Sequence, residues 1–363
     1  MPARAITRRS RSSASQRARA AGRRYKRAID ADINQYAVTW GAPRLRQAIA
    51  RRTTEYNGIP NDAERNVTVC CGATECMLAA LLATLEPGDE VVVFEPFYEN
   101  YGPDAILAGA VPRFVSLRPP DWTFDPEELA AAFSDKTRGI ILNTPNNPTG
   151  KVFTRQELET IAMLCRKWDV VAFSDEIYEH IIYDGAVHVP IATLPGMADR
   201  TVTINALSKT YSVTGWRVGW TIASPELTAG IRKVHDFLTV GAAAPLQEAG
   251  AVALNFPESY YRTLASDYAV RRDLLLAGLR SVGFQCDAPR GAYYILADAA
   301  GLGCRDDVAF ARRLIETVGV GAVPGSSFFS RPELGRTLLR FAFPKTAETL
   351  NEAVARLQRG LAH

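Results

Sequence analysis

The sequence has few of the residues that build metal centres and no segment that could span a membrane. Its histidines number only four and are scattered, which gives neither a histidine metal site nor a Ser-His triad. Its six cysteines show no paired metal-ligand spacing, and two of them are adjacent. No apolar run approaches the roughly 20 residues that a bilayer requires. We therefore predict reduced thiols, no metal and a cytoplasmic protein.

The length and composition indicate a globular protein of more than one domain. A chain of 363 residues, 47% hydrophobic and 22% charged, can bury a large core. The sequence contains no internal repeat and no long linker. We predict a large domain over residues 25–265 and a smaller α+β domain over residues 266–363.

Positive charge is concentrated at the amino terminus. Residues 1–29 hold ten basic residues and no acidic one, whereas the whole chain has a net charge of only +3. Residues 1–24 are compatible with a disordered arm, a nucleic-acid contact or a transit-like peptide. They offer few apolar residues to offset chain entropy, so we predict a basic, solvated leader and do not expect a nucleic-acid partner.

Short apolar runs alternate with helical patterns through most of the chain. This alternation predicts an α/β fold with a mostly parallel central sheet and helices on both faces. A long helix, predicted over residues 258–281, then leads into the smaller C-terminal region. The predicted strands cover residues 66–69, 90–94, 111–115, 139–142, 170–173 and 201–205.

A single lysine, Lys209, is the strongest functional candidate. It follows the predicted strand at residues 201–205, and small and aromatic residues surround it in the sequence. A lysine in such surroundings loses hydration unless it has a partner or a chemical role. Arg217 follows eight residues later. The pair indicates an amine that forms a Schiff base and an arginine that holds an anion, although Lys209 alone would be read as a solvated lysine.

Three further segments point to the same chemistry. They are the turn Asn-Thr-Pro-Asn-Asn-Pro-Thr-Gly at residues 143–150, the strand that delivers Asp175 and Tyr178, and the run Leu-Arg-Phe-Ala-Phe at residues 339–343. In this order, they resemble class I/II aminotransferases, which are pyridoxal-phosphate (PLP) enzymes of fold type I. The chain is most similar to the branch with kynurenine, methionine and succinyl-diaminopimelate aminotransferases, from about Tyr25 to its end.

The resemblance implies a role for each residue around the cofactor ring. Lys209 would form the Schiff base and then carry a proton to and from the substrate. Asp175 would keep the pyridine nitrogen protonated, although a carboxylate there is equally typical of a helix cap. Tyr178 and Asn147 would hydrogen-bond the 3-oxygen of the ring, and Tyr98 would stack on its face. We also expect a cis peptide between Asn147 and Pro148.

The phosphate site implied by the resemblance is a helix amino terminus. Gly72, Ala73 and Thr74 precede a predicted helix, so their amides and the helix dipole would favour an anion. Arg217 would add a charge-assisted bond. Relatives commonly have serine three residues before the lysine, where this chain has Ala206, so we expect one phosphate bond to be missing and the cofactor to be held less tightly.

The resemblance also implies substrate and subunit contacts. Arg340 would bind the substrate α-carboxylate with two parallel bonds. Tyr36 matches a tyrosine that enters the neighbouring subunit's site, which implies a homodimer. Relatives carry a Gly-Phe-Pro-type segment near the amino terminus that this chain lacks. We therefore expect a more open substrate pocket and slow turnover.

The function implied is transfer of an amino group between an L-amino acid and a 2-oxo acid by ping-pong kinetics. A PLP-dependent cysteine-conjugate β-lyase, a racemase and a degenerate PLP-binding homologue remain alternatives, because they would share the cofactor machinery. A PLP-sensing DNA-binding regulator is a further alternative, but the leader is too short for a winged-helix domain. The sequence does not identify the amino donor.

Overall fold

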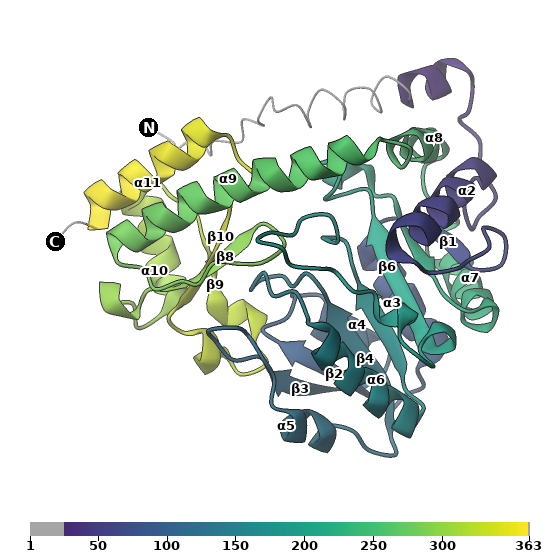
Figure 1. Cartoon of the computed structure of the whole chain (residues 1–363), viewed down its shortest axis with the longest axis horizontal. Coiled ribbons are helices and arrows are strands. Elements are labelled where there is room, and N and C mark those ends of the chain that lie inside the picture. Colours follow the sequence, from purple (N-terminus) through teal and green to yellow (C-terminus); the bar gives the residue numbers. More distant parts are fainter. Residues whose placement is uncertain (1–24, 362–363) are drawn as a thin grey trace.

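The computed structural model describes residues 25–361, so the leader predicted over residues 1–24 lies outside the described residues. A seven-stranded sheet forms the centre of the molecule, in the order β1-β7-β6-β5-β4-β2-β3 (Figure 1). Neighbouring strands pair in parallel, except that β7 is antiparallel to both β1 and β6. The strands are β1 Val67–Cys70, β2 Glu90–Glu95, β3 Val111–Ser116, β4 Thr137–Asn143, β5 Val171–Asp175, β6 Thr201–Ala206 and β7 Gly219–Ile222.

Helices cover both faces of this sheet, which confirms the predicted fold class. Alternate residues of β2 show the reason, because Val91 and Val93 pack with α3 on one face, while Val92 and Phe94 pack with α6 on the other. The helices of the larger part are α2 Pro43–Arg52, α3 Ala73–Thr84, α4 Tyr101–Leu107, α5 Pro126–Ala131, α6 Arg155–Trp168, α7 Pro225–Thr239 and α8 Ala244–Ala253.

Local sequence signals fix where several of these helices begin. Thr154 accepts a bond from the amide of Glu157, whose carboxylate accepts one from the amide of Thr154 in return, and this capping box starts α6. Ser224 caps α7, and proline occupies its first turn. In contrast, α3 begins after Gly72 without a side-chain cap, which leaves its first amides available to a ligand.

A second, three-stranded antiparallel sheet lies at the other end of the molecule, in the order β8-β10-β9. The long helix α9 runs along both parts, next to α11, at the top of Figure 1. The predicted domain boundary between residues 265 and 266 falls within α9, and the boundary remains a prediction. The elements of this region are β8 Tyr294–Asp298, β9 Val323–Pro324, β10 Leu338–Ala342, α9 Glu258–Val282, α10 Asp307–Arg313 and α11 Ala347–Leu361.

Sequence elements far apart in the chain converge at the carboxyl edge of the large sheet. β4 ends at Asn143 and β5 at Asp175, and the turn after β6 carries Lys209. β7 is antiparallel, so its beginning lies at the same edge, directly after Arg217. Open α/β sheets bind ligands at this edge, because loops there can present side chains without disturbing the strands.

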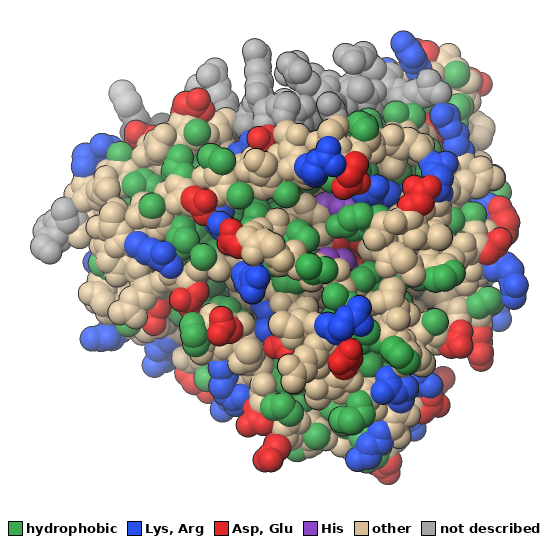
Figure 2. All heavy atoms as spheres, viewed as in Figure 1, with side chains coloured by type: hydrophobic (Ala, Val, Ile, Leu, Met, Phe, Trp, Pro, Cys, Tyr) green, Lys and Arg blue, Asp and Glu red, His purple; other side chains and the backbone are tan. Residues whose placement is uncertain are grey.

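The outer surface mixes charges of both signs. Figure 2 shows Lys and Arg side chains interspersed with Asp and Glu over the face that it presents, with histidine visible in a hollow near its centre. Each described helix is either too short or too polar to cross a membrane.

Candidate active site

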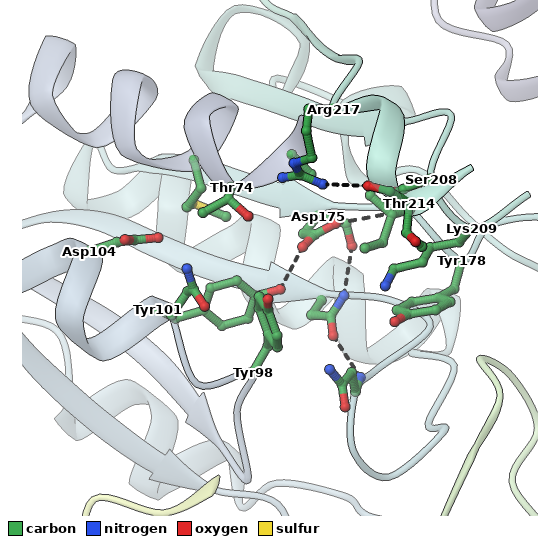
Figure 3. Close-up of a pocket in the computed structure, with 16 residues that line it drawn as sticks. Thr74, Tyr98, Tyr101, Asp104, Asp175, Tyr178, Ser208, Lys209, Thr214 and Arg217 are labelled. Carbon is green, nitrogen blue, oxygen red and sulfur yellow. Dashed lines mark hydrogen bonds between the residues drawn. The ribbon is translucent and has the colours of Figure 1, made fainter. Parts of the chain in front are cut away.

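A cavity at the carboxyl edge of the sheet brings together most of the residues predicted from the sequence. It is bounded by the start of α3, α4, the ends of β4 and β5, and the turns on either side of Lys209 (Figure 3). The predicted residues that line it are Ala73, Thr74, Tyr98, Asn147, Asp175, Tyr178, Lys209 and Arg217.

Lys209 extends into this cavity beside aromatic rings. Its Nζ lies 5.7 Å from the ring centroid of Tyr178 and 5.7 Å from that of Tyr293. The positive charge of Lys209 acts on Asp175, because it lowers the pKa that burial raises. An amine held against ring faces has few competing hydrogen-bond partners, so its lone pair is available for covalent chemistry once the proton is lost.

Asp175 is a buried carboxylate at the end of β5. Its Oδ2 accepts a 2.7 Å bond from the Tyr101 hydroxyl, and its Oδ1 accepts a 3.3 Å bond from the amide of Ile177. Burial raises the pKa of Asp175 to about 6, and the two bonds and Lys209 oppose that rise. Both hydrogen-bond donors are neutral, so the site favours a cationic ligand facing this carboxylate.

The other end of the cavity is built for an anion. Gly72 has a φ of 90°, which favours glycine, and a Cβ added there would collide with the Arg217 guanidinium. A Cβ on Gly219 would lie 2.7 Å from the amide nitrogen of Ala73, so this second glycine lets β7 approach the start of α3. Uncapped helix amides, the hydroxyl of Thr74 and the guanidinium of Arg217 therefore surround one space.

Asn147 connects the cavity to Arg340. The backbone N–H of Asn147 donates a 2.7 Å bond to Asn143 Oδ1. The side-chain Oδ1 of Asn147 accepts a 2.8 Å bond from Arg340 Nη1. The Arg340 guanidinium lies 4.5 Å from the Tyr294 ring, and its buried Nε has no partner among the described residues. The peptide between Asn147 and Pro148 is cis, as predicted.

Several residues of the site were not identified from the sequence, and four of them show why. Tyr101 bonds Asp175, Asn143 bonds both Asn147 and the carbonyl of Asp175, and the Tyr294 hydroxyl lies 3.1 Å from that of Tyr178. Ser208 lines the cavity directly before Lys209. Its adjacency to the lysine was a usable signal, but the other three depend on contacts between distant segments.

Tyr36 does not join the cavity of its own chain. It is 85% exposed and lines a separate depression together with residues 240–244 and Gln247. Its predicted role concerns a second subunit, and that role remains a prediction.

Two buried groups of acidic residues and histidines lie outside the cavity. His235 Nε2 donates a 2.9 Å bond to the carbonyl of Thr39, and its Nδ1 lies 2.6 Å from Oε1 of Glu75, so both ring nitrogens have a partner. His188 lies 2.9 Å from Glu176, beside Glu179. His180 is buried between the rings of Tyr56 and Tyr261.

Comparison with known proteins identifies the family. The model of aminotransferase class I and II matches residues 8–357. The chain belongs to this family. The match begins upstream of Tyr25, where the motifs had placed the start of the resemblance.

The similar proteins are aminotransferases of the expected branch. A probable N-succinyldiaminopimelate aminotransferase, DapC of Mycobacterium tuberculosis, is 40% identical over 91% of this chain and 86% of its own. Kynurenine–oxoglutarate transaminase 3 of Mus musculus is 39% identical over 90% and 78%. The structure of the Mycobacterium tuberculosis N-succinyldiaminopimelate aminotransferase superposes with a TM-score of 0.91 at 39% identity, covering 94% and 89% of the two chains. The Escherichia coli methionine aminotransferase YbdL gives 0.90 at 35% identity, covering the same shares.

The residues present fit the cofactor on which this family generally depends, PLP. Asp175 is a buried hydrogen-bond acceptor, which suits the protonated ring nitrogen of the cofactor. The Nε of Arg340, which has no partner among the described residues, suits the carboxylate of an amino-acid substrate. The space held open by Gly72 beside Arg217 suits a phosphate. Asp175 and Arg217 line the same cavity as Lys209, and Arg340 bonds Asn147, which also lines it.

The Tyr101–Asp175 bond predicts a pH-dependent loss of stability in Tyr101→Phe. The folded pKa of Asp175 is raised above its unfolded value, so the carboxyl is neutral in the folded protein below about pH 6 and ionised above it. A hydroxyl bond to the ionised form contributes about 1.5–3 kcal/mol, and one to the neutral form about 0.5–1.5 kcal/mol. Chemical unfolding of the cofactor-free variant should therefore show the larger loss of unfolding free energy at pH 8 and the smaller at pH 5.

The double variant Tyr101→Phe, Asp175→Asn is the matched control. With no carboxyl to titrate, its stability difference from Asp175→Asn should be the same at both pH values. An equal loss at pH 5 and pH 8 in the single variant would show that Tyr101 does not act through the charge of Asp175.

Proposed function

We propose that the protein is a PLP-dependent aminotransferase that moves an amino group between an L-amino acid and a 2-oxo acid in a ping-pong cycle. The observation that carries the proposal is the grouping of Lys209, Asp175 and Arg217 around one cavity, with Arg340 at its edge. These residues supply an amine, a buried anion and two cations, which are the complementary charges that a pyridine ring, a phosphate and an α-carboxylate require.

Each cofactor-binding residue would act on one part of PLP. Lys209 would hold it covalently, and Asp175 would hold the proton of its ring nitrogen. Tyr178 and Asn147 would bond its 3-oxygen, and Tyr98 would cover one face of the ring. Bound PLP would supply an electron sink for the pair left behind when a proton leaves the substrate α-carbon. Its phosphate would lie on the amides of Gly72, Ala73 and Thr74 and on Arg217.

The remaining steps belong to the protein's own side chains. Arg340 would bind the substrate carboxylate with two parallel hydrogen bonds, and its bond to Asn147 would orient the guanidinium. Lys209 Nζ would then accept the α-proton and return one to the neighbouring carbon, since a free amine in this position is within reach of both. The rings of Tyr178 and Tyr293 border that amine, each with its centroid 5.7 Å from Nζ.

We propose a homodimer with sites shared between subunits. Two exposed apolar side chains, Val38 and Val240, line the same depression as Tyr36, and exposed Ile33 and Phe237 lie a few residues away from these along the chain. Phe237 is 92% exposed, and a patch of this kind is costly in water unless another surface covers it. A second copy of the chain would cover the patch and carry the partner's Tyr36 toward the cavity.

We further propose that the protein works in the cytoplasm. All six cysteines are free, and four of them are buried. Reduced thiols are the usual state in a reducing compartment.

Lys209→Ala should abolish both the cofactor spectrum and activity. The purified protein should absorb in the near-visible range, and borohydride reduction followed by peptide mass spectrometry should place the cofactor on Lys209. The exposed Lys233→Ala is the matched control and should behave as the parent chain does. Reduction onto another lysine would contradict the assignment.

An activity assay with amino donors and 2-oxo acids decides the reaction type. The first panel of donors pairs N-succinyl-diaminopimelate, kynurenine and methionine with 2-oxoglutarate and pyruvate, since these amino donors are named for the relatives. Transamination yields a new amino acid without ammonia, whereas release of ammonia and a thiol from cysteine conjugates would identify a lyase.

Arg340→Ala should weaken substrate binding and leave cofactor binding nearly intact. Loss of charge-assisted bonds typically costs roughly 1.5–3 kcal/mol, so the substrate dissociation constant should rise about tenfold to a hundredfold. Spectral titration with the amino donor measures this constant, and PLP titration provides the second readout. Arg336→Ala, an exposed arginine near the same strand, is the control. An unchanged substrate affinity would remove Arg340 from the site.

Subunit sharing predicts complementation between two impaired variants. Tyr36→Ala and Lys209→Ala should each be impaired, because one lacks the shared tyrosine and the other the amine. After mixing and subunit exchange, the hybrid dimer contains one intact site, so up to a quarter of the parent activity should return in a mixture of equal parts. Failure of the mixture to regain activity, in a dimer shown to exchange by mass spectrometry, would contradict the sharing.

A further inference from the structure

A second buried carboxyl group, that of Asp104, lines the same cavity as Asp175. Asp104 lies on α4, three residues after Tyr101, and is only 5% exposed. Its Oδ2 is buried and has no hydrogen-bond partner among the described residues. Asp104 is one of the residues that line the cavity, so the group that could satisfy this oxygen belongs there.

Asp104 lies on the side of the cavity that holds the start of α3. Helix α4 packs against α3, whose first residues are Ala73 and Thr74. Figure 3 shows the Asp104 side chain on the Thr74 side of the cavity, away from Lys209 and Tyr178. An ionised carboxylate there would oppose a bound phosphate, whereas a protonated one could donate a hydrogen bond to it.

No charged neighbour stabilises the ionised form of Asp104. Burial alone raises the pKa of Asp104 to about 6. The charged groups of the elements packed against α4 have other partners, because Glu75 on α3 is bonded to His235, Glu90 on β2 is paired with Arg113 on β3, and Glu95 on β2 accepts the amide of Ser330. The remaining ionisable groups of the cavity wall are Lys209, Arg217, Asp175, Tyr98, Tyr101 and Tyr178, together with buried Cys76 on α3.

We propose that Asp104 is a proton-dependent ligand of the cofactor's phosphate, donating a hydrogen bond as the neutral acid and repelling the phosphate as the carboxylate. The inference rests on the proposed binding of PLP and adds a residue to it. It concerns only the retention of the cofactor, since Asp104 lies away from the reacting amine.

Two consequences follow from the chemistry. A phosphate dianion beside Asp104 disfavours the carboxylate, so PLP binding takes up a proton wherever the cofactor-free protein has Asp104 ionised. The affinity for PLP must therefore fall as the pH rises above about 6, by at most about tenfold per pH unit for one proton. Pyridoxal, which lacks the phosphate, does not share this dependence.

The test compares Asp104→Asn and Asp104→Ala with the parent chain and with Glu159→Gln, an exposed carboxylate on α6. Cofactor-free protein is titrated with PLP and, separately, with pyridoxal at about pH 6 and pH 8, and calorimetry in two buffers of different ionisation heat counts the protons taken up. Parent and Glu159→Gln should bind PLP about tenfold more weakly at pH 8 than at pH 6, relative to pyridoxal. Asp104→Asn should bind PLP more tightly than the parent at pH 8 and lose the phosphate-specific pH dependence, and Asp104→Ala should lose that dependence as well.

Thermal unfolding of the cofactor-free proteins gives a second reading. The raised folded pKa means that the folded parent holds a proton below about pH 6 that the unfolded chain releases, so its stability falls as the pH rises toward 6. Asp104→Asn should therefore be more stable than the parent at pH 8, and its advantage should shrink as the pH falls from 6 toward 4. An Asp104→Asn protein that keeps the parent's pH dependence for PLP would overturn the inference while leaving PLP binding intact. Failure of every variant, and of the parent, to bind PLP at either pH would overturn the proposed function as well.

Discussion

The constraint on which the site depends is the burial of one negative charge, Asp175, at the end of a central parallel strand. A carboxylate in such a position loses most of its hydration and is retained only where bonds or a cation compensate. The protein provides the Tyr101 hydroxyl and one backbone amide, which are neutral donors, and leaves the cation to be supplied from the cavity. Strands β4 and β6 pair with β5 on either side of Asp175, so strand pairing sets the position of this carboxylate at the sheet edge.

The anion-binding end depends on a different constraint, which is the close approach of two backbones. Gly219 at the start of β7 lies against the start of α3, and Gly72 leaves room for the Arg217 guanidinium. Arg217 itself has a φ of 53°, a conformation that side chains seldom adopt, so the turn before β7 is shaped to bring the guanidinium over the helix amides. The phosphate site is therefore a product of strand pairing as much as of residue type, and it requires that β7 run antiparallel to its neighbours.

Much of this organisation was predictable from the sequence, because it depends on local patterns. Alternation of apolar runs and helices predicted six strands within a few residues of their observed bounds, and the motifs identified Lys209, Asp175 and Arg217 as site candidates. Strand β7 was missed because four residues that begin with a glycine carry too little periodicity. Tyr101, Asn143 and Tyr294 were missed because their roles depend on hydrogen bonds across 32 or more positions or between the two sheets. The roles of the site residues, and the shared site at Tyr36, come from the resemblance and not from any local signal.

The two carboxyl groups that line the cavity, those of Asp175 and Asp104, have opposite surroundings. Asp175 has a hydroxyl and an amide that favour its ionised form, and it faces the position of a cation. Asp104 has an unbonded oxygen and burial alone, which favour its neutral form, and it lies on the side of an anion. Both carboxyl groups have a pKa near 6 in the cofactor-free protein. Bound cofactor would move the two pKa values apart, because its ring charge would lower the pKa of Asp175 and its phosphate would raise that of Asp104. Tyr101 stands on the same helix as Asp104 and contacts Asp175, so α4 carries the residues that set both protonation states.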